Sequence, residues 1–135
     1  MTPLFLDTGF ILALEDADDQ YHKKAKSCWT AYCAHPQPLV TTSYVFDEII
    51  TLIAKRLDHR HAVTVAHRLR SSASVNFVHI DETDFNAAWQ WFERFQDKGF
   101  SFTDCVSFAV MKRLKVKTAL TFDKHFSQAG FDKKP

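Results

Sequence analysis

The chain has 135 residues, of which 46% are hydrophobic, so one core can form without disulfides. Its 17 basic and 16 acidic residues nearly cancel, so any nucleic-acid contact must come from a local basic patch rather than from a strong overall charge. Three cysteines without a C-x-x-C pair, an N-terminus without a basic start and the lack of a long apolar run exclude a disulfide scaffold, a signal peptide and a membrane span. We therefore expect a single domain over residues 1–135, located in the cytoplasm.

The first part of the sequence predicts two short strands with helices between and after them. An apolar run at residues 3–7 indicates a buried strand, which continues into a short helix over 8–14. Residues 18–34 form an amphipathic pattern that two prolines end, and 39–41 is expected to be the second strand. Ser43 is expected to cap a helix that continues to about residue 57. Its inner face is expected to contain Val45, Ile49, Leu52 and Ile53. The inner face of the amphipathic helix is expected to contain Tyr21, Ala25, Cys28, Trp29 and Tyr32.

The middle of the chain predicts two helices with a strand between them. Residues 60–71 and 81–96 have helical periodicity, and 75–80 is a β-branched third strand. We expect the inner face of the first helix to contain Val63, Ala66 and Leu69. We expect the inner face of the second to contain Phe85, Ala88, Trp89, Phe92 and Phe95. Trp91, at the edge of this second stripe, is interpreted as core or as part of a surface for a partner.

The last part of the chain completes an alternation of helices and strands. Residues 101–114 predict a largely apolar and therefore buried helix, and 117–122 predict a fourth strand. A turn is expected at 123–129, and Phe131 marks a potential fifth strand. Strands separated by helices form parallel sheets that are covered on both faces. The predicted fold class is therefore α/β, a three-layer α/β/α sandwich around a four- to five-stranded parallel sheet.

Four acidic residues are predicted to meet at one edge of this sheet. Asp7 follows the first strand, Asp123 follows the fourth, and Asp104 lies in the first turn of the buried helix. Glu48 is about five residues into its helix, roughly 7 Å from the start, and shares the apolar face of Val45. Parallel strands end, and the following helices begin, at the same edge of a sheet. We therefore expect the four carboxylates to converge there.

Converging carboxylates need a neutralising partner. In a cleft of low dielectric constant they raise one another's pKa, and burial raises it further, so either protons or a divalent cation must bind. Carboxylate oxygens are hard ligands that suit Mg²⁺ or Mn²⁺ better than zinc. Such an ion can lower the pKa of a bound water and offset charge on a phosphate during in-line displacement.

Each acid also has a structural explanation. Asp104 stands three residues after Ser101, which is the spacing of a capping box. Asp123 could cap the last helix and Asp7 could be a solvated strand end. Glu48 could be a tolerated charge at an edge. The catalytic interpretation rests on the joint pattern, because four coincidences would have to fall on one edge.

Other charged clusters are interpreted as structural. The three acids that follow the third strand are expected to begin the next helix: Asp81, Glu82 and Asp84. The densest basic stretch comprises Lys55, Arg56, Arg60, Arg68 and Arg70. It could guide RNA phosphates to the acids, although a solvated helix face is the commoner explanation.

Four segments of the sequence are similar to the motifs of PIN-domain proteins. They are residues 5–9, 43–48, 101–104 and 120–126, and they occur in the order of that family. The resemblance is strongest to the VapC-type toxins of bacterial and archaeal toxin–antitoxin pairs. It implies a four- or five-stranded parallel sheet, an endoribonuclease that depends on Mg²⁺ or Mn²⁺, a homodimer, and neutralisation by a small cognate antitoxin of a type II system.

The resemblance also implies roles for particular residues. The positions of the family's acidic, metal-binding residues are occupied by Asp7, Glu48, Asp104 and Asp123. Thr8 and Thr103 match polar positions beside them, where a hydroxyl could orient a water or a ligand carboxylate. The implied reaction is hydrolysis of phosphodiester bonds by a metal-activated water, with a structured RNA such as a tRNA or an rRNA as the expected substrate.

Two other functions stay open from the sequence alone. A catalytically silent module with the PIN fold, binding RNA or protein, is the main alternative, although all four acids are present. The triplet Asp7-Thr8-Gly9 also occurs in aspartic proteases. That fold needs many strands separated by turns, whereas this chain has long helical periodicities, which disfavours the protease.

Overall fold

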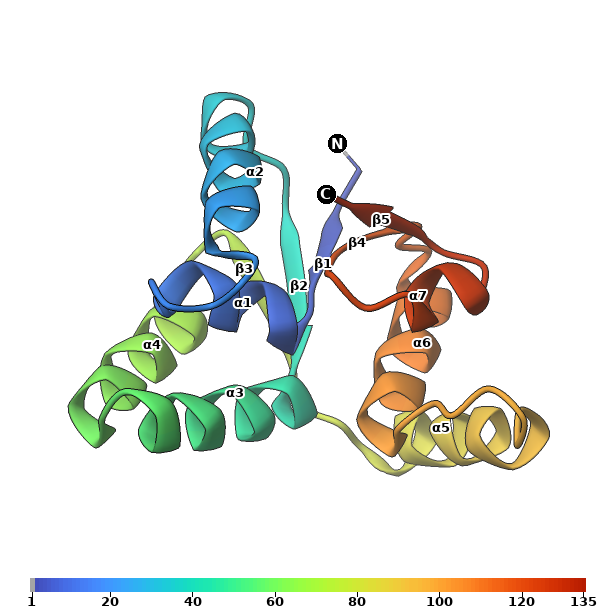
Figure 1. Cartoon of the computed structure of the whole chain (residues 1–135). Helices are drawn as coiled ribbons and strands as arrows, with labels where there is room; N and C mark the ends of the chain where they lie inside the picture. Colours follow the sequence, from blue (N-terminus) through green and yellow to red (C-terminus); the bar gives the residue numbers. More distant parts are fainter. Residues whose placement is uncertain (1) are drawn as a thin grey trace.

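Five parallel strands form one sheet at the centre of the computed structural model, which describes residues 2–135 (Figure 1). The strands are β1 (Leu4–Leu6), β2 (Leu39–Thr42), β3 (Val75–Val78), β4 (Thr118–Leu120) and β5 (Asp132–Lys134). Their order across the sheet is β3-β2-β1-β4-β5, and all neighbours are parallel. The predicted fold class is confirmed, and the fifth strand, which the sequence left open, pairs with β4.

Helices cover both faces of this sheet. One face carries α1 (Thr8–Glu15), α2 (His22–Ala34), α3 (Ser43–Arg56) and α4 (His59–Ser71), in blue to green on the left of Figure 1. The other side carries α5 (Glu82–Arg94), α6 (Phe102–Leu114) and α7 (His125–Gln128), in yellow to red on the right. Among residues 2–135, no helix has the length and apolar character that crossing a membrane requires.

The order of the strands creates a switch point between β1 and β4. From β1 the chain adds β2 and then β3 in one direction, and it afterwards returns to add β4 and β5 on the other side of β1. Because crossovers between parallel strands are right-handed, this reversal moves the later helices to the opposite face. In open α/β sheets, ligands bind at the carboxyl ends of the two strands that flank such a reversal.

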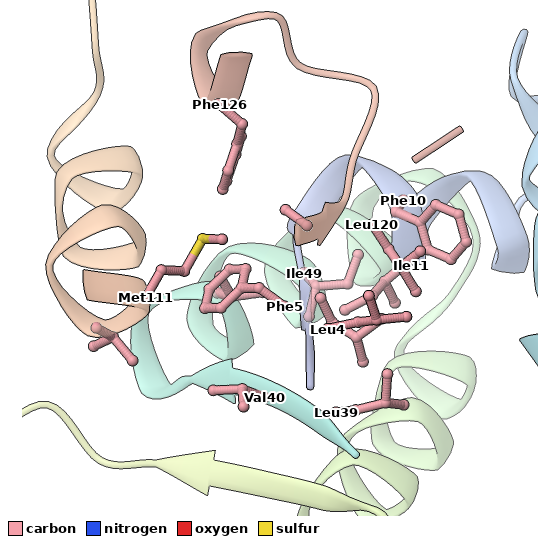
Figure 2. Close-up of a cluster of buried hydrophobic side chains, with 14 of the residues drawn as sticks. Leu4, Phe5, Phe10, Ile11, Leu39, Val40, Ile49, Met111, Leu120 and Phe126 are labelled. Carbon is pink, nitrogen blue, oxygen red and sulfur yellow. The ribbon is translucent and has the colours of Figure 1, made fainter. Parts of the chain in front are cut away.

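The hydrophobic core lies on both sides of β1. Phe5 is fully buried and points toward Met111 and Phe126, whereas Leu4 points to the side of Ile11 (Figure 2). The rings of Phe5 and Phe126 lie 6.2 Å apart. Successive side chains of a strand point to opposite faces, so a strand buried on both faces is apolar at every position. This arrangement fixes β1 between two packed helical layers. It thereby also fixes the position of Asp7, which directly follows β1.

The helix predicted to start at residue 18 begins four residues later, at His22. Asp16 and Asp19 accept hydrogen bonds from the backbone N–H groups of Asp18 and Tyr21, at 3.0 and 2.8 Å. Such local bonds from aspartate side chains stabilise turns in place of a helix. The predicted start was therefore wrong, because the aspartate side chains bind backbone N–H groups two residues further along and form turns there.

The predicted cap of α3 was also wrong. Thr42 is the capping residue, and its Oγ1 accepts a hydrogen bond from the backbone N–H of Val45 at 3.2 Å. The hydroxyl of Ser43 instead accepts from the backbone N–H of Ile80 at 3.0 Å. Ser43 therefore ties α3 to the end of β3, a long-range role that local sequence rules do not reveal.

The inner face of α4 differs from the predicted one. Leu69 is buried as expected, but Val63 is 42% exposed and Ala66 is only partly buried. The buried partners of Leu69 are Ala62 and Val65. Positions 62, 65 and 69 follow the helical repeat, whereas repeated steps of three drift around the helix.

The aromatic stripe of α5 faces outward, contrary to the prediction. Ala88 is fully buried as expected. Phe85, Trp89 and Phe92 are instead 43%, 50% and 40% exposed. The inner face contains Asp84, which is 2% exposed and binds Arg113 through two hydrogen bonds of 2.7 and 2.9 Å. A buried carboxylate, paired with a half-exposed arginine, thus occupies the place that the sequence pattern assigned to aromatic rings.

The prediction that the acids after the third strand begin the next helix is confirmed, because Glu82 and Asp84 lie in the first turn of α5. Asp81 caps α5, because its Oδ1 accepts a hydrogen bond from the backbone N–H of Asp84 at 2.9 Å. Asp84 itself is held by Arg113. Trp91 belongs to the edge of the core, since its ring packs against Phe108 at 5.3 Å between centroids.

Candidate active site

Asp7 is the most deeply buried of the four predicted acids. It directly follows β1, and 7% of its surface is exposed. Burial is the main cause that raises the pKa of its carboxyl group to about 7, and the charges of Asp104 and Asp123 raise it further. Hydrogen bonds from Thr121 and the backbone of Thr8 lower this pKa in part. Without a cation, Asp7 is therefore partly protonated near neutral pH.

Thr121 joins Asp7 to Asp123, and the sequence analysis missed it. It directly follows β4 and is completely buried. Its Oγ1 donates a hydrogen bond to Asp7 Oδ2 at 2.7 Å and accepts one from the backbone N–H of Asp123 at 3.0 Å. One hydroxyl thus fixes two acids from opposite ends of the sequence. The available signal was a hydroxyl residue at the end of an apolar strand, two positions before an acid.

His125 lies between Asp104 and Asp123, and it was not predicted as part of the site. Its Nδ1 atom is 3.2 Å from Asp104 Oδ2 and 3.3 Å from Asp123 Oδ1. Asp123 Oδ1 also accepts the backbone N–H of His125 at 2.9 Å, which fixes the loop after β4. Each of the three side chains offers a ligand atom, and these atoms lie within 4.8 Å of one another.

Asp104 combines the structural and the candidate functional role. It forms a capping box with Ser101, whose Oγ accepts the backbone N–H of Asp104 at 3.0 Å while Asp104 Oδ2 accepts the backbone N–H of Ser101 at 3.1 Å. Burial is the main cause that raises the pKa of Asp104; the Ser101 bond opposes this, and the charge of Asp123 adds to it. The capping explanation is therefore correct, and the same bonds hold the carboxylate at the site.

Glu48 reaches the site from α3. Its Oε1 atom accepts a hydrogen bond from Thr8 Oγ1 at 2.6 Å. Thr8 is buried and directly follows Asp7, so this bond ties α3 to the end of β1. The neighbouring Asp47 is exposed, as expected for a position turned by about 100° around the helix.

All four predicted acids line one cleft of about 800 Å³ at the switch point. Thr8 lines it too, whereas Thr103 does not. Thr103 instead contributes its backbone carbonyl, which accepts a hydrogen bond from Ser107 Oγ at 3.1 Å. The structure therefore brings together five of the six predicted site residues and places Thr103 outside the cleft lining.

The donor atoms of the cleft fit a divalent cation. Neighbouring ligands of an octahedral ion with bonds of about 2.1 Å lie roughly 3.0 Å apart. Ligand atoms of Asp104, Asp123 and His125 lie within 4.8 Å of one another, close enough for the two carboxylates to approach one ion or its bound waters. The raised pKa of Asp7 shows that this cleft disfavours another uncompensated negative charge. A bound cation would supply the compensation.

The rim of the cleft contains an arginine and an aromatic residue. Arg56, from the predicted basic stretch, lines the cleft, and its Nη1 lies 3.7 Å from Asp19 Oδ2. Arg68, from the same stretch, instead pairs with Glu15 at 3.0 Å in a different groove. Tyr21 was predicted to face inward, but it is 37% exposed and lines the cleft.

An acidic cleft thus lies at the switch point of a five-stranded parallel sheet, where open α/β proteins bind their ligands. The model of the PIN domain family matches residues 4–132. The chain therefore belongs to the PIN domain family.

Several known proteins are similar to this chain. The 23S rRNA-specific endonuclease VapC20 of Mycobacterium tuberculosis is 38% identical over 128 residues, which cover 95% of each chain. The crystal structure of VapC20, described as a toxin that cleaves the sarcin–ricin loop, has a TM-score of 0.88 at 36% identity and covers 98% of this chain and 99% of its own. A VapC ribonuclease of Archaeoglobus fulgidus is 28% identical over 129 residues, covering 90% of this chain and 78% of the relative.

More distant structures share the fold alone. VapBC-1 from nontypeable Haemophilus influenzae has a TM-score of 0.70 at 15% identity and covers 98% of this chain and 97% of its own. The interpretation of the sequence as a PIN-domain protein of the VapC type is confirmed by the family match and by the similarity to VapC20 along nearly the whole chain.

Proposed function

We propose that this protein is the toxin of a type II toxin–antitoxin pair and an endoribonuclease that hydrolyses phosphodiester bonds in structured RNA. The observation that carries the proposal is the convergence of Asp7, Glu48, Asp104 and Asp123 on one cleft. A silent binding module would have no need to keep four carboxylates together against their repulsion. Cleavage in the cytoplasm is consistent with the three free cysteines, which suit a reducing compartment.

The four acids would hold Mg²⁺ or Mn²⁺, and the ligand atoms of two of them, Asp104 and Asp123, lie within 4.8 Å of each other. When bound, the cation supplies Lewis acidity, which lowers the pKa of a water and offsets charge on the phosphate. As a ligand of that cation Asp7 would be deprotonated, and the hydrogen bond from Thr121 would hold its carboxylate in place. Thr8 orients Glu48 in the same manner. Thr103 does not line the cleft and has no part in this mechanism.

The proposed substrate is a stem-loop of ribosomal RNA. VapC20, described as specific for 23S rRNA, is 38% identical to this chain along 95% of both, and its fold is the same. An open cleft with acids at its base admits a phosphate that a folded loop presents. Ribosomal RNA is therefore favoured over tRNA, the other structured RNA that the sequence suggested.

The proposed antitoxin site is a second groove, of about 670 Å³, on the face of α1, α2 and α4. Its floor is apolar and is formed by Ile11, Leu14, Trp29, Tyr32 and Leu69. Charged side chains stand in the same lining, including the ion pair of Glu15 and Arg68. An apolar floor with a charged border suits an amphipathic helix, and we assign this groove to a helix of the small cognate antitoxin.

The proposed homodimer uses the outward aromatic side chains of α5. We define the α5 aromatic face as Phe85, Trp89, Phe92 and Phe102. Phe102, the first residue of α6, packs against Phe85 at 5.1 Å and against Phe92 at 6.1 Å between ring centroids. Contiguous exposed aromatic surface favours association, and a two-fold axis through such a face buries both copies of it.

Cleavage of a 23S rRNA stem-loop, with mapping of the new 5′ ends, tests the proposed nuclease. We expect Mn²⁺- or Mg²⁺-dependent cleavage by the parent protein, which EDTA stops and added cation restores. Asp104→Asn should lower the rate by at least about 100-fold, since a ligand charge is lost. Asp97→Asn, which removes an exposed acid outside the cleft, is the matched control. Cleavage that persists in EDTA, or in Asp104→Asn at the parent rate, would refute the proposal.

A further inference from the structure

Tyr21 forms the outer end of a column of stacked rings beside the acids. Its ring lies on Phe122 with 4.5 Å between centroids and 6° between planes. Phe122 in turn stacks on Phe10 at 5.9 Å and 19°. Phe10 is completely buried, so the column is anchored in the core. Tyr21 itself is 37% exposed although one of its faces is covered by Phe122.

The backbone holds Tyr21 in this position from a second direction. Its N–H group donates a hydrogen bond to Asp19 Oδ1 at 2.8 Å, at the start of α2. Asp19 Oδ2 lies 3.7 Å from Arg56, which lines the cleft. The ring is thus presented by a fixed turn and supported by a fixed neighbour, which limits the entropy lost when a ligand stacks on it.

The platform is adjacent to the proposed reaction centre. Phe122, which supports Tyr21, directly precedes Asp123, and consecutive Cα atoms lie about 3.8 Å apart. Tyr21 and Phe122 also line a second hollow of about 660 Å³, whose border contains Lys24 and Lys133. The aromatic pair therefore stands between the acids on one side and two lysines on the other.

We propose that Tyr21 stacks against an unpaired base of the RNA, in the nucleotide next to the cleaved phosphate. Proteins that recognise single-stranded RNA loops stack splayed bases on aromatic rings, because each base has a flat face. Lys24 and Lys133 can contact the phosphate on the far side of that nucleotide. The acids then act on one phosphate while the base beside it is held. This inference rests on the proposed ribonuclease activity.

Binding of a fluorescent RNA stem-loop without cation tests the platform. The probe is a stem-loop of the sarcin–ricin type with 2-aminopurine at single loop positions, measured in EDTA by anisotropy and by 2-aminopurine quenching. We compare the parent with Tyr21→Leu, which keeps an apolar cover on Phe122 but has no flat ring, and with Tyr21→Trp, which restores one. Phe77→Leu, at the β3 edge of the sheet, removes a ring that does not line the cleft and is the matched control.

We expect Tyr21→Leu to bind about ten-fold more weakly or worse and to lose the quenching, whereas Tyr21→Trp and Phe77→Leu keep both. In cleavage assays, Tyr21→Leu should raise KM more than it lowers kcat. Mn²⁺ should raise the melting temperature of all variants equally. That result would show that each variant is folded and that the arrangement of its acids is unchanged.

Three outcomes would overturn the proposal. If Tyr21→Leu bound the RNA as tightly as the parent, Tyr21 would not be a stacking platform, whereas the proposed nuclease activity would be unaffected. Weaker binding with quenching retained would show that Tyr21 acts without stacking. A parent protein that fails to bind the RNA at all would overturn this inference together with the proposed function.

Discussion

The carboxyl group of Asp7 couples the stability of the protein to pH. Its pKa is raised from 3.8 to about 7 in the native protein, mainly by burial. Between about pH 4 and pH 7 the native state therefore binds a proton that the unfolded chain has lost. Stability from this group is fully present below about pH 4 and is lost as the pH rises through about 7. The rise in pKa corresponds to a loss of roughly 4 kcal/mol from the free energy of unfolding between low and high pH.

We predict that Asp7→Asn removes this pH dependence in the metal-free protein. Asparagine carries no charge, so the variant should be more stable than the parent at pH 8, and this advantage should be much smaller at pH 5. Urea unfolding in EDTA at several pH values measures the difference. Asp97→Asn, an exposed acid outside the cleft, should follow the parent. An advantage of Asp7→Asn that is the same at pH 5 and pH 8 would contradict the assigned cause.

Thr121 is expected to be essential for the geometry of the site. Thr121→Val keeps the shape but removes the hydroxyl that bonds Asp7 and the N–H of Asp123, leaving both without this partner. We expect a loss of about 1–3 kcal/mol of stability together with weaker Mn²⁺ binding. Thr121→Ser should restore most of both. Calorimetric titration with Mn²⁺ and urea unfolding give the two readouts, and unchanged Mn²⁺ affinity in Thr121→Val would show that the bond does not position the acids.

The acids themselves were predictable because carboxylates at strand ends and on an apolar helix face are conspicuous in a sequence. Thr121 and His125 could not be predicted as site residues, each for a different reason. A threonine suits the end of a strand on packing grounds alone, so its position two residues before an acid is only a weak signal of these hydrogen bonds. His125 is one of seven histidines, and only the fold of the loop after β4 brings it to Asp104.

At the scale of whole elements, periodicity located the longer helices, whereas α7 was expected to be a turn, and in α4 and α5 it did not decide which face is buried. α5 carries apolar residues on two faces: Ala88 and Trp91 lie inward, and Phe85 and Trp89 lie outward. The inward face also contains Asp84, whose charge weakens the apolar signal until Arg113 is known to neutralise it. Ion pairs between residues distant in sequence are the information that a local pattern lacks.

The outward face of α5 gives a prediction about assembly. If the α5 aromatic face joins two copies, Trp89→Glu places two buried charges at the interface and should convert dimers to monomers. Gln90→Glu adds the same charge at the next exposed position of the helix and should leave the dimer intact. Sedimentation velocity at several concentrations measures both variants. A parent protein that is monomeric at high concentration would contradict the proposed homodimer.

At the scale of the whole molecule, alternation of strands and helices was enough to predict a parallel sheet with helices on both faces. The order of the strands was not predictable, because a hydrophobic pattern does not say which strands are neighbours. The carboxyl ends of parallel strands share one edge whatever the order of the strands. The sequence could therefore predict that the acids meet at this edge. The hydrogen bond from Thr121 to Asp7 does depend on the strand order, because it requires β1 to lie next to β4.

The pairing of β1 with β4 has a consequence for how the cleft forms during synthesis. Asp7 leaves the ribosome before Asp123, which follows a strand that ends at residue 120. Chains fold progressively from the N-terminus as they are translated, so β2 and β3 can join β1 first. An unfinished nascent chain therefore holds Asp7 and Glu48 but not the other half of the cleft. The cleft is therefore complete only once the chain has been extended past Asp123 and β4 has paired with β1.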